Sequence, residues 1–78
     1  MNDQAFYKEL GLIFKDVRTE HNMSQQDVAD RIGVTRSCYA NWEQGIRSID
    51  MVSFYKLCNV FLLDPNDVIN KVRRYLYK

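Results

Sequence analysis

Residues 23–45 have the sequence MSQQDVADRIGVTRSCYANWEQG, which contains the start and end signals of two helices. Ser24 and Thr35 each precede an amphipathic run and can cap a helix, because a hydroxyl accepts a hydrogen bond from an amide of the first turn. Gly33 and Gly45 follow the two runs, at the position where a helix often ends in a left-handed residue. The stretch therefore predicts two short helices joined by a tight turn, at about 25–32 and 36–44.

The same features predict three more helices outside this stretch. Apolar residues spaced four, three and four apart, from Phe6 to Val17, form one face of a helix. Asp50 can cap an apolar segment, and Asp64-Pro65 supplies a cap followed by a proline at the first helical position. The expected bounds of these helices are about 4–21, 51–62 and 65–77. Because no segment alternates as a strand does, the sequence predicts an all-α fold of five helices.

Length and composition fit one small globular domain. The chain has 78 residues, of which 46% are hydrophobic and 27% charged, an ordinary balance for a single modest core. No apolar stretch approaches the ~20 residues that a membrane span needs, and the start MNDQAFYKEL is too polar for a signal peptide. We therefore expect one cytoplasmic helix-turn-helix domain over 1–78, with its helix-turn-helix unit at about 24–44.

The sequence offers little for catalysis or metal binding. Cys38 and Cys58 are too few for a disulfide framework and form no Cys-x-x-Cys pair. Cys38 is expected to be a half-buried filler rather than a redox switch, because no basic residue flanks it closely. His21, the single histidine, has no nucleophile or acid at a catalytic spacing, and there is no glycine-rich phosphate loop. We therefore expect a protein that is not an enzyme and uses no cofactor or metal.

The second of the two short helices divides into a polar and an apolar side. At ~100° per residue, its polar side chains fall within an arc of about 140°, and Tyr39 and Trp42 lie opposite. The polar arc contains Arg36, Ser37, Asn41 and Gln44, with Ala40 at its centre. Guanidinium, amide and hydroxyl groups pair with base edges in the DNA major groove, and a small central residue allows close approach. A merely solvated face would more often carry Lys and Glu, so this face favours DNA recognition.

Groups suited to phosphate contacts flank that helix. Gln25 and Gln26 begin the preceding helix, where free amides and the helix dipole favour an anion. Arg47 and Ser48 follow the polar helix and can reach the sugar-phosphate backbone. The net charge of +1 is weak evidence for a nucleic-acid partner. Its distribution is mildly favourable, because residues 31–48 carry three basic side chains and one acidic one.

Taken together, residues 23–45 resemble the phage-repressor and Cro family of helix-turn-helix regulators. The matching elements are Ser-Gln, an apolar-Ala pair, Gly-Val-Thr and a closing apolar-Glu-x-Gly. The resemblance extends from about Phe14 to Val68. It implies a lambda-repressor-like fold and a regulator, most simply a repressor, that binds double-stranded operator DNA in a sequence-specific way. Departures fall at Ile46, where a basic residue is frequent, at Ile49, where proline is common, and at Leu62, where glycine is common.

The resemblance also assigns roles to individual side chains. Arg18 is expected to form a buried or half-buried ion pair with Glu43 that holds the recognition helix on the scaffold. Base contacts fall on Arg36, Ser37 and Asn41, with Gln44 nearer the backbone. Phosphate contacts fall on Ser24, Gln25, Arg47 and Ser48, with Gln26 beside them.

A single recognition helix makes few contacts, so we expect a homodimer that binds an operator with dyad symmetry, its half-sites ~34 Å apart. The last helix carries aromatic residues beyond the usual four-helix core of the family, which makes Val72, Tyr75 and Leu76 the expected dimer contacts. An alternative remains open. An antitoxin-like or protein-interaction module would use the same fold with a regulatory protein partner on the C-terminal helix.

Overall fold

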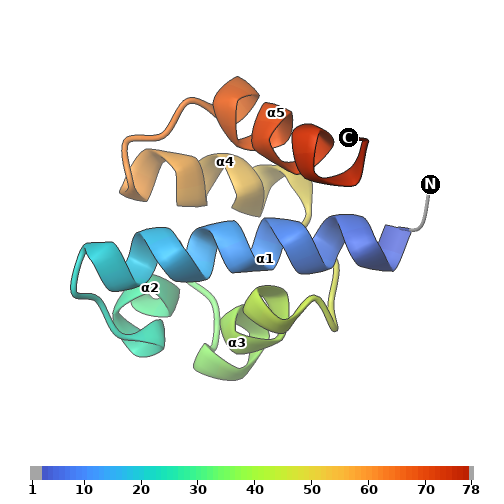
Figure 1. Cartoon of the computed structure of the whole chain (residues 1–78). Coiled ribbons are helices and arrows are strands. Elements are labelled where there is room, and N and C mark those ends of the chain that lie inside the picture. The colour runs from blue at the N-terminus through green and yellow to red at the C-terminus, as the bar shows by residue number, and fades with distance from the viewer. Residues whose placement is uncertain (1–2, 78) are drawn as a thin grey trace.

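The computed structural model describes residues 3–77, which form five α-helices and no strand (Figure 1). The helices are α1 (Asp3–Glu20), α2 (Gln25–Ile32), α3 (Arg36–Gln44), α4 (Met51–Val60) and α5 (Pro65–Leu76). The expected all-α fold is confirmed, and the bounds of α2 and α3 are those predicted. Within this described range, no helix is both long and apolar enough to cross a membrane.

Capping side chains fix the two short helices. The Ser24 hydroxyl accepts a hydrogen bond from the Asp27 amide at 3.0 Å, and the Ser24 amide donates to the Asp27 carboxylate at 2.9 Å. This reciprocal pair satisfies two amides at the start of α2. Thr35 caps α3 in the same way, accepting from the Cys38 amide at 3.1 Å. Gly33, with φ of 78°, takes the left-handed conformation that turns the chain from α2 toward α3.

The end of α4 differs from the prediction. The helix was expected to reach residue 62 but ends at Val60, because Leu62 adopts a left-handed φ of 55°. That turn lets the Leu63 amide donate to the Cys58 carbonyl at 2.8 Å, satisfying a carbonyl at the helix end. The Leu62 side chain is left 92% exposed. Leu62 therefore occupies a conformation that glycine adopts at lower cost.

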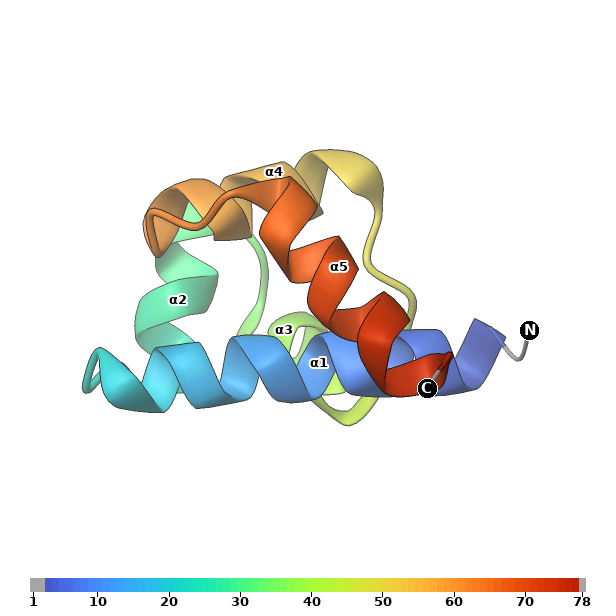
Figure 2. The ribbon, with the colours of Figure 1, turned by 45° about the horizontal axis from the view of Figure 1, so that its top comes forward.

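The helices are arranged around α1 in two groups. Figure 1 shows α2 and α3 on one side of α1, and α4 and α5 on the other. Figure 2 shows α5 crossing over α1 at a steep angle. The core lies between these layers, and its largest fully buried side chains are Phe14, Val28, Tyr39, Leu57, Cys58 and Val72. The outer surface of α3 is consequently left uncovered by the other described helices.

The contact between α1 and α3 depends on Gly11. A Cβ atom at this position would overlap the Trp42 carbonyl oxygen and lie 2.5 Å from the Glu43 carbonyl oxygen. Only a residue without a side chain lets the two backbones approach this closely. The missing side chain therefore sets the distance between α3 and α1.

Candidate nucleic-acid interface

The outer face of α3 presents the polar side chains that the sequence placed there. Arg36, Ser37 and Gln44 are exposed, and Asn41 is half-buried beside Ala40. On the opposite side, Tyr39 and Trp42 are buried, while Cys38 is half-buried. The structure thus brings the four candidate base-contacting residues together on one accessible face, which contains no acidic side chain.

A buried ionic cluster anchors this face from behind. Arg18 on α1 donates from Nε to Oε2 of Glu43 at 2.6 Å and from Nη2 to Oε1 at 3.1 Å. Its remaining nitrogen, Nη1, donates to the Met23 carbonyl at 2.8 Å. The two side chains are only 12% and 3% exposed. This bidentate geometry is the strong form of an ion pair and fixes orientation as well as distance.

Gln25 joins the same carboxylate from α2. Its Nε2 donates to Glu43 Oε1 at 3.0 Å, so one carboxylate on α3 binds both α1 and α2. Burial acts to raise the pKa of Glu43, but the hydrogen bonds from Arg18 and Gln25 outweigh it and hold the pKa below its usual value. The hydrogen bond to Glu43 likewise raises the pKa of Arg18. Both groups are therefore charged at neutral pH.

Two buried side-chain polar atoms of α3 have no hydrogen-bond partner among residues 3–77. They are the Tyr39 hydroxyl oxygen and the Trp42 indole nitrogen. Burial raises the pKa of Tyr39, and the neighbouring Glu43 carboxylate raises it further. Because an unpaired buried polar group costs stability, these two side chains contribute to the core mainly through their rings, which pack edge to face.

The candidate phosphate contacts lie at the start of α2 and in the segment after α3, and two of them already have hydrogen-bond partners. Ser24, Arg47 and Ser48 are exposed. The Gln25 amide, in contrast, already donates to Glu43, and Gln26 Nε2 donates to Asp30 at 2.8 Å. Each glutamine can therefore donate to a phosphate only through the second hydrogen of its Nε2, or after its present hydrogen bond has broken.

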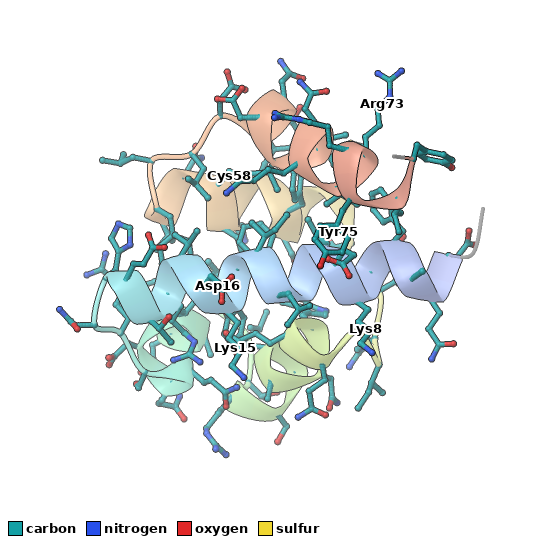
Figure 3. All side chains as sticks on the ribbon, viewed as in Figure 1. Lys8, Lys15, Asp16, Cys58, Arg73 and Tyr75 are labelled. Atoms are coloured by element: carbon teal, nitrogen blue, oxygen red, sulfur yellow. The ribbon has the colours of Figure 1, made fainter. Side chains whose placement is uncertain are left out.

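The structure adds two lysines of α1 to the candidate phosphate contacts. Lys8 and Lys15 are exposed, and Figure 3 shows both projecting from α1 toward the side where α2 and α3 lie. The backbone of Lys8 packs against Gly45 at the end of α3, because a Cβ on that glycine would be 2.6 Å from the Lys8 Cα. Helical spacing alone could not reveal this proximity, which depends on how α3 packs on α1.

The expected dimer contacts on α5 need a correction. Val72 is completely buried in the core of its own chain, so it has no surface to offer a second copy. Tyr75 is 62% exposed and Leu76 is half-buried. Val72 thus packs α5 onto its own domain, whereas Tyr75 remains on the surface.

The cysteines and other potential ligands form no site within residues 3–77. No three His, Cys, Asp or Glu side chains of this range are grouped to hold a metal ion. Cys58 is buried, and burial raises the pKa of its thiol to about 11, so it is a thiol rather than a thiolate at neutral pH.

Comparison with known proteins agrees with this geometry. A family model described as helix-turn-helix matches residues 14–68, which is most of the chain. The chain belongs to this family of Cro/C1-type helix-turn-helix proteins, whose members are DNA-binding transcriptional regulators. A search of curated protein sequences finds no significant match.

Solved structures of regulators share the fold. The restriction-modification controller protein C.AhdI from Aeromonas hydrophila is 26% identical, with a TM-score of 0.75 over 80% of this chain and 94% of its own. A structure of the clp gene regulator ClgR from Corynebacterium glutamicum is 14% identical, with a TM-score of 0.83 over 90% of this chain and 74% of its own. At that identity, the likeness to ClgR concerns the fold alone.

Proposed function

We propose that this chain is one DNA-binding domain that binds an operator of dyad symmetry as a homodimer and represses transcription by occupying it. The observation that carries the proposal is the exposed, acid-free face of α3, held in place by the buried Arg18–Glu43–Gln25 cluster. A base-reading helix must be positioned within a fraction of an ångström, and such positioning comes from supporting contacts of this kind.

The chemistry of each side chain suggests its share of the recognition. Arg36, at the start of α3, suits a bidentate contact with guanine, and Asn41 suits adenine. Ser37 can donate or accept, and Gln44 lies at the end of α3, nearer the sugar-phosphate backbone. Ala40 keeps the centre of the face low enough for the helix to enter the groove.

Phosphate contacts would set the orientation of the domain on the duplex. Ser24 at the start of α2, with Arg47 and Ser48 in the segment after α3, provides hydroxyl and guanidinium donors on both sides of the recognition face. Lys8 adds a cation beside the end of α3. Contacts of this kind contribute affinity that falls with salt and carry no sequence information.

The test is selection of bound duplexes from random DNA with the wild type and with paired variants. Arg36→Ala is compared with Arg73→Ala, because Arg73 is an exposed arginine that points away from α3 on the far side of the molecule (Figure 3). Asn41→Ala is compared with Asn59→Ala, an exposed asparagine on α4. Each lost base contact should cost about 1–3 kcal/mol and relax the motif at particular positions.

The wild type should yield one symmetric motif that both controls retain. Placing that motif across a promoter should lower reporter output in proportion to occupancy. Random recovered sequences, or equal effects of Arg36→Ala and Arg73→Ala, would instead favour the alternative of a protein-interaction module. Raised reporter output would reject repression while leaving DNA recognition intact.

A further inference from the structure

Ala40 is the one apolar residue on the polar face of α3. The other members of that face are Arg36, Ser37, Asn41 and Gln44. Ala40 is half-buried, whereas Arg36 and Gln44, one helical turn before and after it, are exposed. Because the side chain of alanine ends at its Cβ, the centre of the face is a shallow apolar depression between longer polar side chains.

Thymine presents the group that matches this depression. All four bases show hydrogen-bonding groups in the major groove, but thymine alone adds an apolar group, the methyl on its C5 atom. We propose that the Ala40 methyl contacts the C5-methyl of one thymine in each half-site, which makes Ala40 a specificity-determining residue. The proposal rests on the proposed function and adds a third base to it, beside the guanine suited to Arg36 and the adenine suited to Asn41.

The backbone alone determines where the Ala40 methyl lies. Alanine has no side-chain torsion that moves a heavy atom, so its Cβ follows the course of α3. The next residue along, Asn41, accepts hydrogen bonds at its carbonyl from the amides of Ile46 and Arg47, at 3.0 and 3.4 Å. These bonds tie α3 to the segment after it. An apolar contact needs heavy atoms within about 4.5 Å, so a methyl in a fixed place suits it.

The opposite side of α3 is fixed by α1. Glu43 accepts two hydrogen bonds from Arg18, and the Trp42 carbonyl lies against Gly11. Because these contacts come two and three residues after Ala40, α3 cannot rotate about its axis without disturbing them. The Ala40 methyl is therefore placed more rigidly than the long side chains of the same face, and it is the group best suited to detect a single methyl on the DNA.

A spacer is the competing role for Ala40. In that role its small size would only let α3 approach the groove floor, and no contact would depend on the thymine methyl. Uracil differs from thymine only by lacking this methyl, so a spacer would bind both bases equally well. A methyl contact predicts a difference instead. The loss of one buried apolar carbon corresponds to about fourfold in affinity for each half-site changed.

Gel-shift titration of the selected operator tests the proposal. Each thymine of one half-site is replaced in turn by deoxyuridine, and each duplex is titrated at one salt concentration with the wild type and with Ala40→Gly. Ala5→Gly is the matched control, because Ala5 is a half-buried alanine of another helix, α1. The two substitutions lower helix propensity by a similar amount, and circular dichroism verifies that both variants fold.

The wild type should lose about fourfold in affinity when one particular thymine becomes uracil. Ala5→Gly should lose the same factor at that position, whereas Ala40→Gly should bind the thymine and uracil duplexes equally. Wild-type affinity that no uracil changes would overturn the proposal. It would also be overturned by an operator whose half-sites contain no thymine, or by a uracil effect that persists unchanged in Ala40→Gly.

Cytosine at the sensitive position provides an independent test. The base 5-methylcytosine carries the same C5-methyl as thymine, but it has the exocyclic amine of cytosine. Cytosine should weaken wild-type binding, and its methylation should restore about fourfold. With Ala40→Gly, the methylation should restore nothing. If methylation leaves wild-type affinity unchanged, the thymine preference comes from its O4 acceptor, and the methyl contact is wrong.

The outcomes also separate this proposal from the proposed function. If selection yields no operator, sequence-specific DNA recognition fails, and the methyl contact fails with it. If an operator emerges and depends on Arg36 and Asn41, but uracil and 5-methylcytosine have no effect, DNA recognition stands and Ala40 is a spacer.

Discussion

Glu43 joins three helices through a single carboxylate. It stands on α3, accepts from Arg18 of α1 and accepts from Gln25 of α2. The family resemblance predicted Arg18 as its partner. The bond from Gln25 was missed, because this glutamine was assigned to phosphate. Only the relative placement of α2 and α3 brings its amide to the carboxylate, and no spacing within either helix encodes that placement.

The depressed pKa of Glu43 predicts how stability depends on pH. A carboxylate with a lowered pKa in the folded state contributes stability above its unfolded pKa, near 4.5, and loses it as pH falls through the folded value. Glu43→Gln should therefore be less stable than the wild type by about 1–3 kcal/mol at neutral pH. The difference should shrink as pH falls below 4.5.

Urea unfolding followed from neutral pH to about pH 3 measures this difference. Glu20→Gln is the control, since Glu20 is an exposed carboxylate at the end of α1. Wild-type and Glu43→Gln stabilities that stay parallel across the whole range would contradict the prediction, because the Glu43 charge would then contribute nothing to folding.

At the scale of whole elements, local chemistry determined how well helices could be predicted. α2 and α3 have a capping hydroxyl at the start and a glycine at the end, and both were predicted with their observed bounds. α4 has a capping residue, Asp50, at its start but no glycine at its end. The apolar periodicity therefore predicted an end at residue 62, two residues beyond the observed end at Val60. The turn at Leu62 forms because the core holds Leu57 and Phe61 inward, a tertiary effect that outweighs the local preference of leucine.

Leu62→Gly should stabilise the domain. Leucine at a φ of 55° pays the steric cost of a left-handed residue, and its side chain, being exposed, gains little from packing. Glycine removes that cost but has more entropy in the unfolded chain, so a net gain of about 0.5–1 kcal/mol is expected. Unfolding by denaturant measures this difference in the free energy of unfolding. Asn22→Gly is the control, with the same φ of 55° in a residue type that tolerates it, and a gain there equal to that at Leu62 would contradict this explanation.

Gly11→Ala should destabilise, although alanine normally strengthens a helix interior. The added Cβ would press on the backbone carbonyls of Trp42 and Glu43, which cannot move without shifting α3. The expected loss is about 1–3 kcal/mol, with a change in the emission of Trp42, the single tryptophan. Gly33→Ala is the comparison: its Cβ would meet nothing within 4 Å, so only its left-handed φ of 78° is strained. An unaltered Trp42 spectrum in Gly11→Ala would argue against a close α1–α3 contact.

For the molecule as a whole, the sequence shows which residues are apolar, but it does not show which of them stay exposed to solvent after the helices have packed. Val72 and Met51 both occupy helical positions that could face a core or a partner. Packing of α5 over α1 buries Val72 completely, whereas Met51 at the first turn of α4 is left 74% exposed. The fold and the polar face of α3 could thus be predicted from local patterns. The surface available to a second copy depends on how the helices pack together.

Operator geometry should report on the dimer as a whole. B-DNA turns once in about 10.5 base pairs, so inserting about five between the half-sites rotates one of them to the opposite face of the duplex. A rigid dimer can then engage one half-site only, and wild-type affinity should fall to that for an isolated half-site. A duplex that carries a single half-site is the control. Gel-shift titrations at one fixed salt concentration compare the three duplexes, and salt must be held constant because phosphate contacts make every affinity salt-dependent. An unchanged affinity after the insertion would mean that two copies bind without a fixed contact between them.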